Sequence, residues 1–303
     1  MELKEHLKKK GVQPELCKLI LLVADISKDI SAAFHTHQHI TDTKNIHGEQ
    51  QMALDKHADM LLINAMEKSK LVRNVASEEQ DEILEIKKAE GSYGVVMDPL
   101  DGSSLINVNL SVGTIVGFFD EGNVMEPGKK MDAAMYVLYG PITSLVYCAG
   151  GGVHEFVLDQ DGVYRCRAED LMIPDGKIYS PGGTRKDYTP SHRTFIENLE
   201  DRGFKPRFSG GFVPDFNIVL HQGGVFTYPA LEGKPNGKLR LLFEGNPMGF
   251  IAKHAGGYAS DGHGPMLDKK PVSIADRTPL YIGSKSIVKE IEEIQSKEGE
   301  QDS

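Results

Sequence analysis

The chain has 303 residues, of which 40% are hydrophobic and 26% are charged, a normal balance for a globular protein of one large domain or two ordinary ones. The formal net charge of −10 argues against nucleic acid or an anionic membrane as a partner. It leaves an anionic small molecule open, because bound metal ions can invert the charge of an acidic pocket. The sequence contains no run of about 18 apolar residues, so it predicts no membrane span. Residues 1–10 lack the apolar core of a secretory signal. The three cysteines have no CxxC spacing, so we expect a reducing, cytoplasmic location and no zinc site.

The first predicted elements are two helices separated by a loop. Apolar residues recur at helical spacing after Pro14 and predict a helix that runs to about Phe34. Residues 35–47 are polar and aperiodic, which is typical of a loop. A second helix is expected over residues 50–68, and its predicted buried side consists of Met52, Leu61, Leu62, Ala65 and Met66.

Short apolar runs then predict a series of strands. Residues 94–97 form a run that ends at Asp98, which predicts a buried strand with carboxylates at its C-terminal end, where α/β sheets place ligands. The turn signals Gly140-Pro141 and Asp161-Gly162 lie between further apolar segments, and the second of them predicts a hairpin. These further strands are expected at residues 110–119, 135–139, 144–148, 154–158 and 163–167.

The polar stretch at residues 168–177 interrupts this pattern and is the expected boundary between two subdomains, 1–168 and 169–303. Beyond it, strand and helix signals alternate. Asn246 is expected to cap the last well-marked helix, and Pro247 suits its first position. Strands are expected at residues 178–180, 224–228 and 239–243, helices at 191–200 and 247–254, and a partly helical, charged tail from 287.

Two acidic segments carry the chemistry of the chain. Residues 98–104 read DPLDGSS, so Asp98 and Asp101 lie three positions apart, and Glu78 and Glu79 form a second acidic pair upstream. Isolated acids are usually solvated, but Asp98 follows a strand that should be buried, and a buried carboxylate must be paired or bind a metal. Hard divalent cations need clustered oxygen ligands, whereas phosphate is bound by small residues with free N–H groups. The two segments therefore predict a metal-dependent phosphatase site, although the Gly-Ser-Ser sequence alone also suits an ordinary turn.

Three further acids are weaker candidates on spacing alone. Glu244 precedes the helix predicted at Pro247, and the helix dipole is sufficient to explain a negative charge there. Glu49 and Asp55 are six residues apart and do not share a helix face, so their spacing favours solvated positions.

Taken together, these segments resemble class I fructose-1,6-bisphosphatases of the lithium-sensitive phosphatase superfamily. The later half is more similar to the sedoheptulose-1,7-bisphosphatase branch, in residues 152–156, 179–182, 210–215, 260–263 and 276–278. The segments that carry the fructose-1,6-bisphosphatase resemblance are NIHGEQ (45–50), SEE (77–79), DPLDGSS (98–104), SVGTI (111–115), NGKLRLLFE (236–244) and AGG (255–257).

The resemblance implies a fold and an activity. The fold is α/β (α+β), a five-layer α-β-α-β-α sandwich in which residues 1–168 form a metal-binding, allosteric-type subdomain and residues 169–303 a sugar-bisphosphate-binding one. The activity is that of a sugar bisphosphate 1-phosphatase, a phosphoric monoester hydrolase of carbohydrate metabolism in gluconeogenesis or the Calvin cycle. It implies two or more Mg²⁺ per subunit, with Mn²⁺ able to substitute, and a homotetramer or homodimer.

The resemblance also implies roles for single residues. Asp55 and Glu79 would orient the attacking water, and Glu49 is a third catalytic candidate that stands where the family usually has Asp. The loop at about residues 34–52 matches a mobile loop that closes over the metals. The implied metal ligands are Glu78, Glu79, Asp98, the Leu100 carbonyl, Asp101 and Glu244, and the implied binding residues for the scissile phosphate are Asp101, Gly102, Ser103 and Ser104.

The implied binding site for the distal phosphate departs from the fructose pattern. Arg207, Tyr228 and Lys238 match the family, and Arg207 would reach into the site of the neighbouring subunit. This chain lacks three hydrogen-bonding side chains of that pattern, so the sequence leaves open whether the specificity for fructose 1,6-bisphosphate is strict. The replacements are Pro181, Thr184 and Phe208, and Arg185 or Lys186 is the expected source of replacement charge.

Several alternatives accompany this interpretation. Sedoheptulose-1,7-bisphosphatase activity, alone or alongside the fructose activity, is the nearest. An inositol or nucleotide phosphatase is disfavoured because such relatives usually carry a Trp-containing segment and this chain has no Trp. The complete set of metal carboxylates disfavours a non-catalytic metabolite-binding protein. The nucleotide motif expected near residues 12–17 and a Lys at Ser92 are both missing, so we expect no AMP inhibition, and no disulfide switch is expected either.

Overall fold

The computed structural model describes residues 1–34, 40–44 and 50–301. Its helices are α1 (Leu3–Lys9), α2 (Pro14–Ala33), α3 (Ala53–Ser69), α4 (Pro190–Asp201), α5 (Phe212–Gln222), α6 (Asn246–His254) and α7 (Lys285–Gln301). A π-helical turn, η4, spans Leu241–Gly245, and 3₁₀ turns span Ser103–Val108 (η1), Gly128–Lys130 (η2), Arg185–Asp187 (η3) and Met266–Asp268 (η5). Within these ranges, no helix is long and apolar enough to cross a membrane.

The strands form two large sheets and one small pair. The first half contributes β3 (Val72–Ser77), β4 (Leu84–Glu85), β5 (Tyr93–Asp101), β6 (Val112–Phe119), β7 (Ala133–Tyr139), β8 (Thr143–Cys148), β9 (Val153–Leu158) and β10 (Tyr164–Ala168). The second half contributes β11 (Ile178–Pro181), β12 (Lys205–Pro206), β13 (Val225–Tyr228), β14 (Tyr258–Ser260) and β15 (Leu280–Gly283), and β1 (Ile40–Lys44) pairs with β2 (Gln50–Met52).

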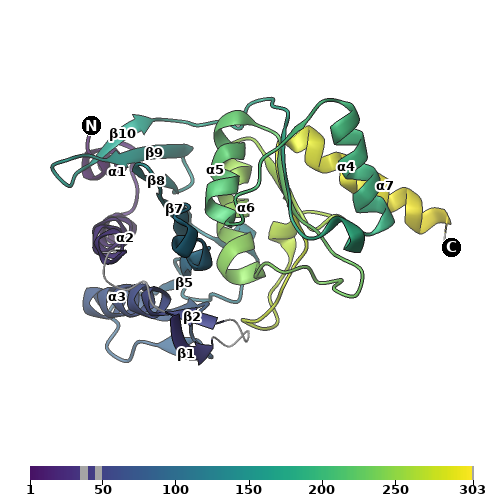
Figure 1. Ribbon diagram of the computed structural model, residues 1–303. Coiled ribbons are helices and arrows are strands. Elements are labelled where there is room, and N and C mark those ends of the chain that lie inside the picture. The colour runs from purple at the N-terminus through teal and green to yellow at the C-terminus, as the bar shows by residue number, and fades with distance from the viewer. Residues whose placement is uncertain (35–39, 45–49, 302–303) are drawn as a thin grey trace.

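The eight-stranded sheet has the order β10-β9-β8-β7-β6-β5-β3-β4 and is antiparallel except for the β3–β5 pair. The five-stranded sheet has the order β12-β11-β13-β15-β14, in which the first two pairs are parallel and the last two antiparallel. Figure 1 shows how they stack: α2 and α3 cover one face of the large sheet, α5 and α6 lie between the sheets, and α4 and α7 cover the far side. This is the expected five-layer α-β-α-β-α sandwich.

Strand β5 shows why the apolar runs form the centre of the large sheet. All nine of its residues are buried, as expected for a strand covered by helices on both faces. Its side chains alternate: Val95 and Met97 pack into the core under α1, α2 and α3, while Val96 packs into the core between the two sheets. The predicted strand at residues 94–97 is thus confirmed, and it continues to Asp101.

The structure corrects the predicted elements at residues 239–246 and at the start of the second helix. The strand expected at residues 239–243 is wrong, because Leu241–Gly245 form the π-helical turn η4; a short buried apolar run does not distinguish a strand from a helical turn. The expected cap Asn246 is already inside α6, where Gly245 takes the cap position and makes no side-chain hydrogen bond. The second helix begins at Ala53, since Gln50–Met52 form β2.

The loop expected at residues 35–47 contains a strand, because Ile40–Lys44 pair with β2, and its remaining residues lie outside the described ranges. The predicted buried side of α3 is confirmed for Leu62, Ala65 and Met66, whereas Leu61 is only partly buried. Helix α1 and helix α5, both missed by the sequence patterns, are present.

The buried His192 should make the stability of the folded protein sensitive to acid. His192 on α4 lies with its Nδ1 atom 3.1 Å from the Tyr281 hydroxyl, and its ring packs edge-on against Tyr188. Burial lowers the pKa of His192 to about 3. Since the unfolded chain binds this proton at about pH 6.5 and the folded protein does not, the free energy of unfolding should fall by about 1.4 kcal/mol per pH unit as the pH drops between these values.

The measurement is urea unfolding of the wild type and of His192→Phe between pH 7 and pH 4. The variant should lose stability less steeply with falling pH than the wild type, and His263→Asn, at an exposed position, is the matched control for the loss of an imidazole. Equal slopes for the wild type and His192→Phe would contradict the assignment.

Candidate active site

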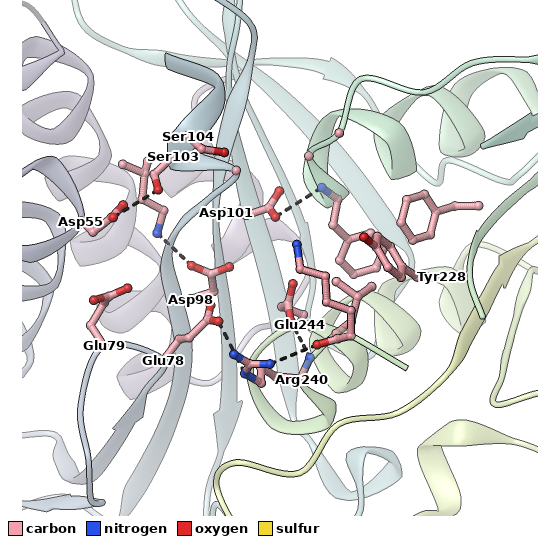
Figure 2. Close-up of a pocket in the computed structure, with 18 of the residues that line it drawn as sticks. Asp55, Glu78, Glu79, Asp98, Asp101, Ser103, Ser104, Tyr228, Arg240 and Glu244 are labelled. Atoms are coloured by element: carbon pink, nitrogen blue, oxygen red, sulfur yellow. Dashed lines mark hydrogen bonds and ion pairs between the residues drawn. The ribbon is translucent and has the colours of Figure 1, made fainter. Parts of the chain in front are cut away.

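A cavity of about 440 Å³ opens where β5 ends, and segments from both halves of the chain line it. In Figure 2, Asp55, Glu78 and Glu79 approach from one side and Tyr228 from the other. The lining residues are Asp55, Glu78, Glu79, Asp98, Leu100, Asp101, Gly102, Ser103, Ser104, Phe208, Gly210, Gly211, Phe212, Phe226, Tyr228, Lys238, Leu239, Arg240 and Glu244.

The deepest part of this pocket is a cluster of three buried carboxylates. Asp98, Asp101 and Glu244 each bring a ligand oxygen to within 4.8 Å of the others, and their exposed fractions are 4%, 7% and 6%. Burial, reinforced by neighbouring negative charges, raises the pKa values of Asp98 and Glu244 well above their usual range and that of Asp101 to about 6. Three acids held this way are stable as anions only beside a cation, and a set of hard carboxylate oxygens suits a divalent cation. The residues present therefore fit a metal ion.

A local irregularity in β5 brings Asp98 and Asp101 to the same place. In a regular strand, residues three apart point to opposite faces, but the pairing register of β5 with β6 shifts between Asp98 and Asp101. The Leu100 N–H donates to Asp98 Oδ1 at 3.0 Å, which closes the kink. Asp101 then accepts N–H groups from the first turn of α5, those of Phe212 (3.2 Å) and Val213 (2.6 Å). Helix α5 thus fixes the second carboxylate.

Glu244 reaches the cluster from the π-helical turn η4. Its carboxylate accepts the backbone N–H of Arg240 at 2.5 Å, which closes the turn on itself. The buried guanidinium of Arg240 donates to the Lys238 carbonyl at 3.0 Å, and its Nε lies 3.7 Å from Glu78. Arg240 therefore places a positive charge beside the acidic cluster. No role for Arg240 could be predicted from the sequence, in which its one signal is its position inside the matching segment 236–244.

Asp55 and the Gly-Ser-Ser segment meet at the opposite wall. Asp55 lies in the first turn of α3, is buried, and accepts a hydrogen bond from the Ser103 hydroxyl at 3.1 Å. Gly102 has φ +77°, a conformation that favours glycine, and a Cβ there would lie 3.3 Å from Gly211 Cα. The turn at residues 102–104 and the loop at residues 210–211 thus pack together as one wall of the pocket.

The other end of the pocket contains aromatic and cationic side chains. The Lys238 ammonium lies 5.7 Å from the centre of the Tyr228 ring, and the half-exposed Phe208 lines the opening. Phe212 and Phe226 add apolar surface that the sequence analysis did not predict. They belong to segments whose apolar residues are typical of an ordinary core, so the sequence gives no signal that they face a pocket.

Three of the described predicted site residues are not brought together with the rest, and a fourth candidate cannot be placed. Among the described residues that line the cavity, Thr184, Arg185 and Arg207 are absent. Arg185 forms ion pairs with two carboxylates of α4, and the exposed Arg207 donates to a neighbouring carbonyl. Glu49 lies outside the described residues. The roles expected for these four residues stay predictions.

Comparison with known proteins identifies this architecture. The chain matches the family model "Fructose-1-6-bisphosphatase, N-terminal domain" over residues 2–168 and the corresponding C-terminal domain model over residues 172–296. The chain belongs to the fructose-1,6-bisphosphatase family. The class 1 fructose-1,6-bisphosphatase of Geobacter sulfurreducens is 48% identical over 287 residues, which cover 93% of this chain and 92% of that protein. The class 1 relative from Methanocorpusculum labreanum is 44% identical and covers 96% and 91% of the two chains.

The fold of a solved fructose-1,6-bisphosphatase agrees with that of this chain. The crystal structure of the Leishmania major enzyme in holo form has a TM-score of 0.93 and 28% sequence identity, and the match covers 98% of this chain and 99% of the other. The predicted family and the five-layer fold are confirmed. Membership of the fructose-1,6-bisphosphatase family also implies metal-dependent catalysis, in agreement with the buried acidic cluster.

Proposed function

We propose that this protein is a Mg²⁺-dependent fructose-1,6-bisphosphatase, which hydrolyses fructose 1,6-bisphosphate to fructose 6-phosphate and phosphate in carbohydrate metabolism. The observation that carries the proposal is the cluster of Asp98, Asp101 and Glu244, buried in a cavity that also holds the Gly102–Ser104 turn and Lys238. A pocket with acids at one end and a cation at the other suits a substrate with two phosphates. The cytoplasmic location stays a prediction.

In this proposal, oxygen atoms of residues that line the pocket would hold the metal. We assign the ligands to five carboxylates and one carbonyl, with two or more ions per subunit and Mn²⁺ able to replace Mg²⁺. When bound, the ions lower the pKa of water and offset the charge of the phosphoryl oxygens. The proposed ligands are Glu78, Glu79, Asp98, the Leu100 carbonyl, Asp101 and Glu244.

The protein's own groups account for orientation and proton transfer. Asp55, which accepts the Ser103 hydroxyl, and Glu79 both line the pocket. In this proposal they would accept a proton from the attacking water and aim the water at the phosphorus atom. Glu49, which is not described, is proposed as a third acid that joins them. The hydroxyl and N–H groups of Gly102–Ser104 would bind the scissile phosphate.

The distal phosphate would meet Lys238 and Tyr228, with Phe208 at the opening. Arg207 is exposed and does not line the pocket of its own chain, which agrees with a role in the site of a neighbouring subunit of a homotetramer or homodimer. We further propose that residues 1–168 form a metal-binding subdomain and residues 169–303 a sugar-bisphosphate-binding one.

A second candidate function is the hydrolysis of sedoheptulose 1,7-bisphosphate. It is favoured by Phe208, which lines the pocket with 51% of its surface exposed where the fructose pattern has a Tyr. Without that hydroxyl the distal end offers one hydrogen bond fewer to the substrate, which would relax the selection for fructose 1,6-bisphosphate.

The test compares kcat/KM for phosphate release from fructose 1,6-bisphosphate, sedoheptulose 1,7-bisphosphate and inositol 1-phosphate with Mg²⁺. We expect turnover of fructose 1,6-bisphosphate and none of inositol 1-phosphate. Turnover of the sedoheptulose substrate at an equal or higher kcat/KM would establish the second function. Preference for inositol 1-phosphate, or no turnover at all, would reject the proposal.

A further inference from the structure

The acidic pair Glu78 and Glu79 occupies the two central positions of a tight turn at the end of β3. The N–H of Gln80 donates to the carbonyl of Ser77 at 3.2 Å, which closes the turn. The N–H of Glu78 donates to the Met97 carbonyl at 3.1 Å, so the turn is also tied to β5. The direction of both Glu side chains therefore depends on how the corners of this turn, at Ser77 and Gln80, are held.

A single buried carboxylate holds both corners. Asp59 on α3 is 4% exposed; its Oδ1 accepts the Ser77 hydroxyl at 2.6 Å and its Oδ2 accepts the Gln80 amide at 2.5 Å. Asp59 is not among the described residues that line the cavity, and burial raises its pKa while these two hydrogen bonds oppose that effect. Both oxygens are thus engaged by the residues that flank the acidic pair.

Helix α3 joins this contact to the pocket. Asp55 and Asp59 are four residues apart and share one face of the helix. Asp55 lines the cavity. Asp59, one helical turn later, accepts hydrogen bonds from the two residues that flank Glu78 and Glu79. One rigid helix consequently sets the distance between Asp55 and Glu79, which are the two groups proposed to orient the attacking water.

We propose that Asp59 is a positioning residue that fixes the Ser77–Gln80 turn, so that Glu78 and Glu79 face the metals at a set distance from Asp55. The role assigned to the turn rests on the proposed function. Asp59 acts through the turn and touches neither substrate nor metal. Partners that orient metal ligands typically change metal affinity or activity by about 10- to 100-fold when removed.

The experiment compares Asp59→Ala, Gln80→Ala and the double variant with the wild type. Asp59→Ala should lower kcat by about 10- to 100-fold and weaken Mn²⁺ binding by a similar factor, with KM for the sugar bisphosphate changed less than about twofold. Gln80→Ala should show a smaller loss in the same two quantities. The double variant should be no worse than Asp59→Ala, because both changes remove one shared contact. Glu155→Gln, a buried acid paired with Arg167 and His221 away from the pocket, should match the wild type.

The conservative variant Asp59→Asn distinguishes a positioning role of Asp59 from a role in folding alone. Asn keeps an acceptor for Ser77, and its NH₂ can donate to a flipped Gln80 amide, so this variant should recover most of the activity and Mn²⁺ affinity. If Asp59→Ala does not fold, Ser77→Ala and Gln80→Ala carry the same test. Variants that lose thermal stability but keep kcat and Mn²⁺ affinity would overturn the proposal.

Mn²⁺ affinity is measured by electron paramagnetic resonance on the substrate-free protein, so this readout does not depend on which sugar is the substrate. If the wild type hydrolyses no bisphosphate, the proposed function fails, and the Mn²⁺ comparison still decides the role of Asp59. Weaker Mn²⁺ binding in Asp59→Ala than in Glu155→Gln supports positioning, and equal binding overturns it.

Discussion

Replacing Asp98 with Asn is expected to lower kcat by about 10³-fold at saturating Mg²⁺ and, in the metal-free protein, to raise stability. Asp98 lies with Asp101 and Glu244 in a buried cluster, so the replacement removes a proposed metal ligand. Burial and the neighbouring acids raise its pKa, which means that the folded protein binds a proton more readily than the unfolded chain. At neutral pH the ionised group therefore destabilises the metal-free fold, and a neutral amide relieves this cost.

The Asn side chain in Asp98→Asn has nearly the same shape as the Asp side chain that it replaces. Its oxygen can still accept the Leu100 N–H that Asp98 accepts at 3.0 Å, so the kink of β5 should persist. Phosphate release and thermal unfolding, each with and without Mg²⁺, measure the two effects, and Asp81→Asn on the surface is the matched control. An Asp98→Asn enzyme with Mg²⁺-dependent activity within tenfold of the wild type, or with a less stable metal-free fold, would refute the assignment.

Replacing Asp55 with Asn is expected to lower kcat by about 10²- to 10³-fold while leaving Mg²⁺ affinity and KM nearly unchanged. Asp55 is buried at the pocket wall and accepts the Ser103 hydroxyl at 3.1 Å, a hydrogen bond that an amide oxygen can still accept. The amide cannot take a proton from water, so only the proton-transfer role is removed. The loss should therefore appear in kcat alone.

The measurement is steady-state phosphate release across a Mg²⁺ titration and a substrate titration. Asp25→Asn, an exposed acid of α2 that pairs with Lys28, serves as the matched control and should behave as the wild type. A large increase in the Mg²⁺ requirement of Asp55→Asn would show that Asp55 is a metal ligand and not a proton acceptor.

The periodic elements of the fold could be predicted from the sequence because their burial is one-sided or continuous. Helix α2 shows apolar residues at helical spacing, and β5 shows the unbroken apolar run of a strand covered on both faces. The same apolar pattern that correctly predicted β5 gave a wrong prediction of a strand at residues 239–243. Both segments are apolar and buried, and only long-range packing makes one of them a π-helical turn.

The pattern DPLDGSS pointed to Asp98 and Asp101, whereas Asp55 and Glu244 became candidates only through the family resemblance, and the geometry that joins these acids could not be predicted. Spacing alone places Asp98 and Asp101 on opposite faces of a strand, and the register shift that unites them has no sequence signal beyond the Pro between them. The contacts of Arg240 and Asp59 depend on chain segments that meet only in the folded protein. The ion pairs of Arg185 with Glu197 and Glu200 likewise could not be foreseen from its charge.

Phosphate release from fructose 1,6-bisphosphate, measured after removal of metals with EDTA and again after adding Mg²⁺, tests the central claim most directly. We predict no release without metal and full recovery with Mg²⁺, at a kcat/KM well above that for inositol 1-phosphate. Release that persists in EDTA, or no release with either Mg²⁺ or Mn²⁺, would contradict the assignment of the Asp98, Asp101 and Glu244 pocket as a metal-dependent bisphosphatase site.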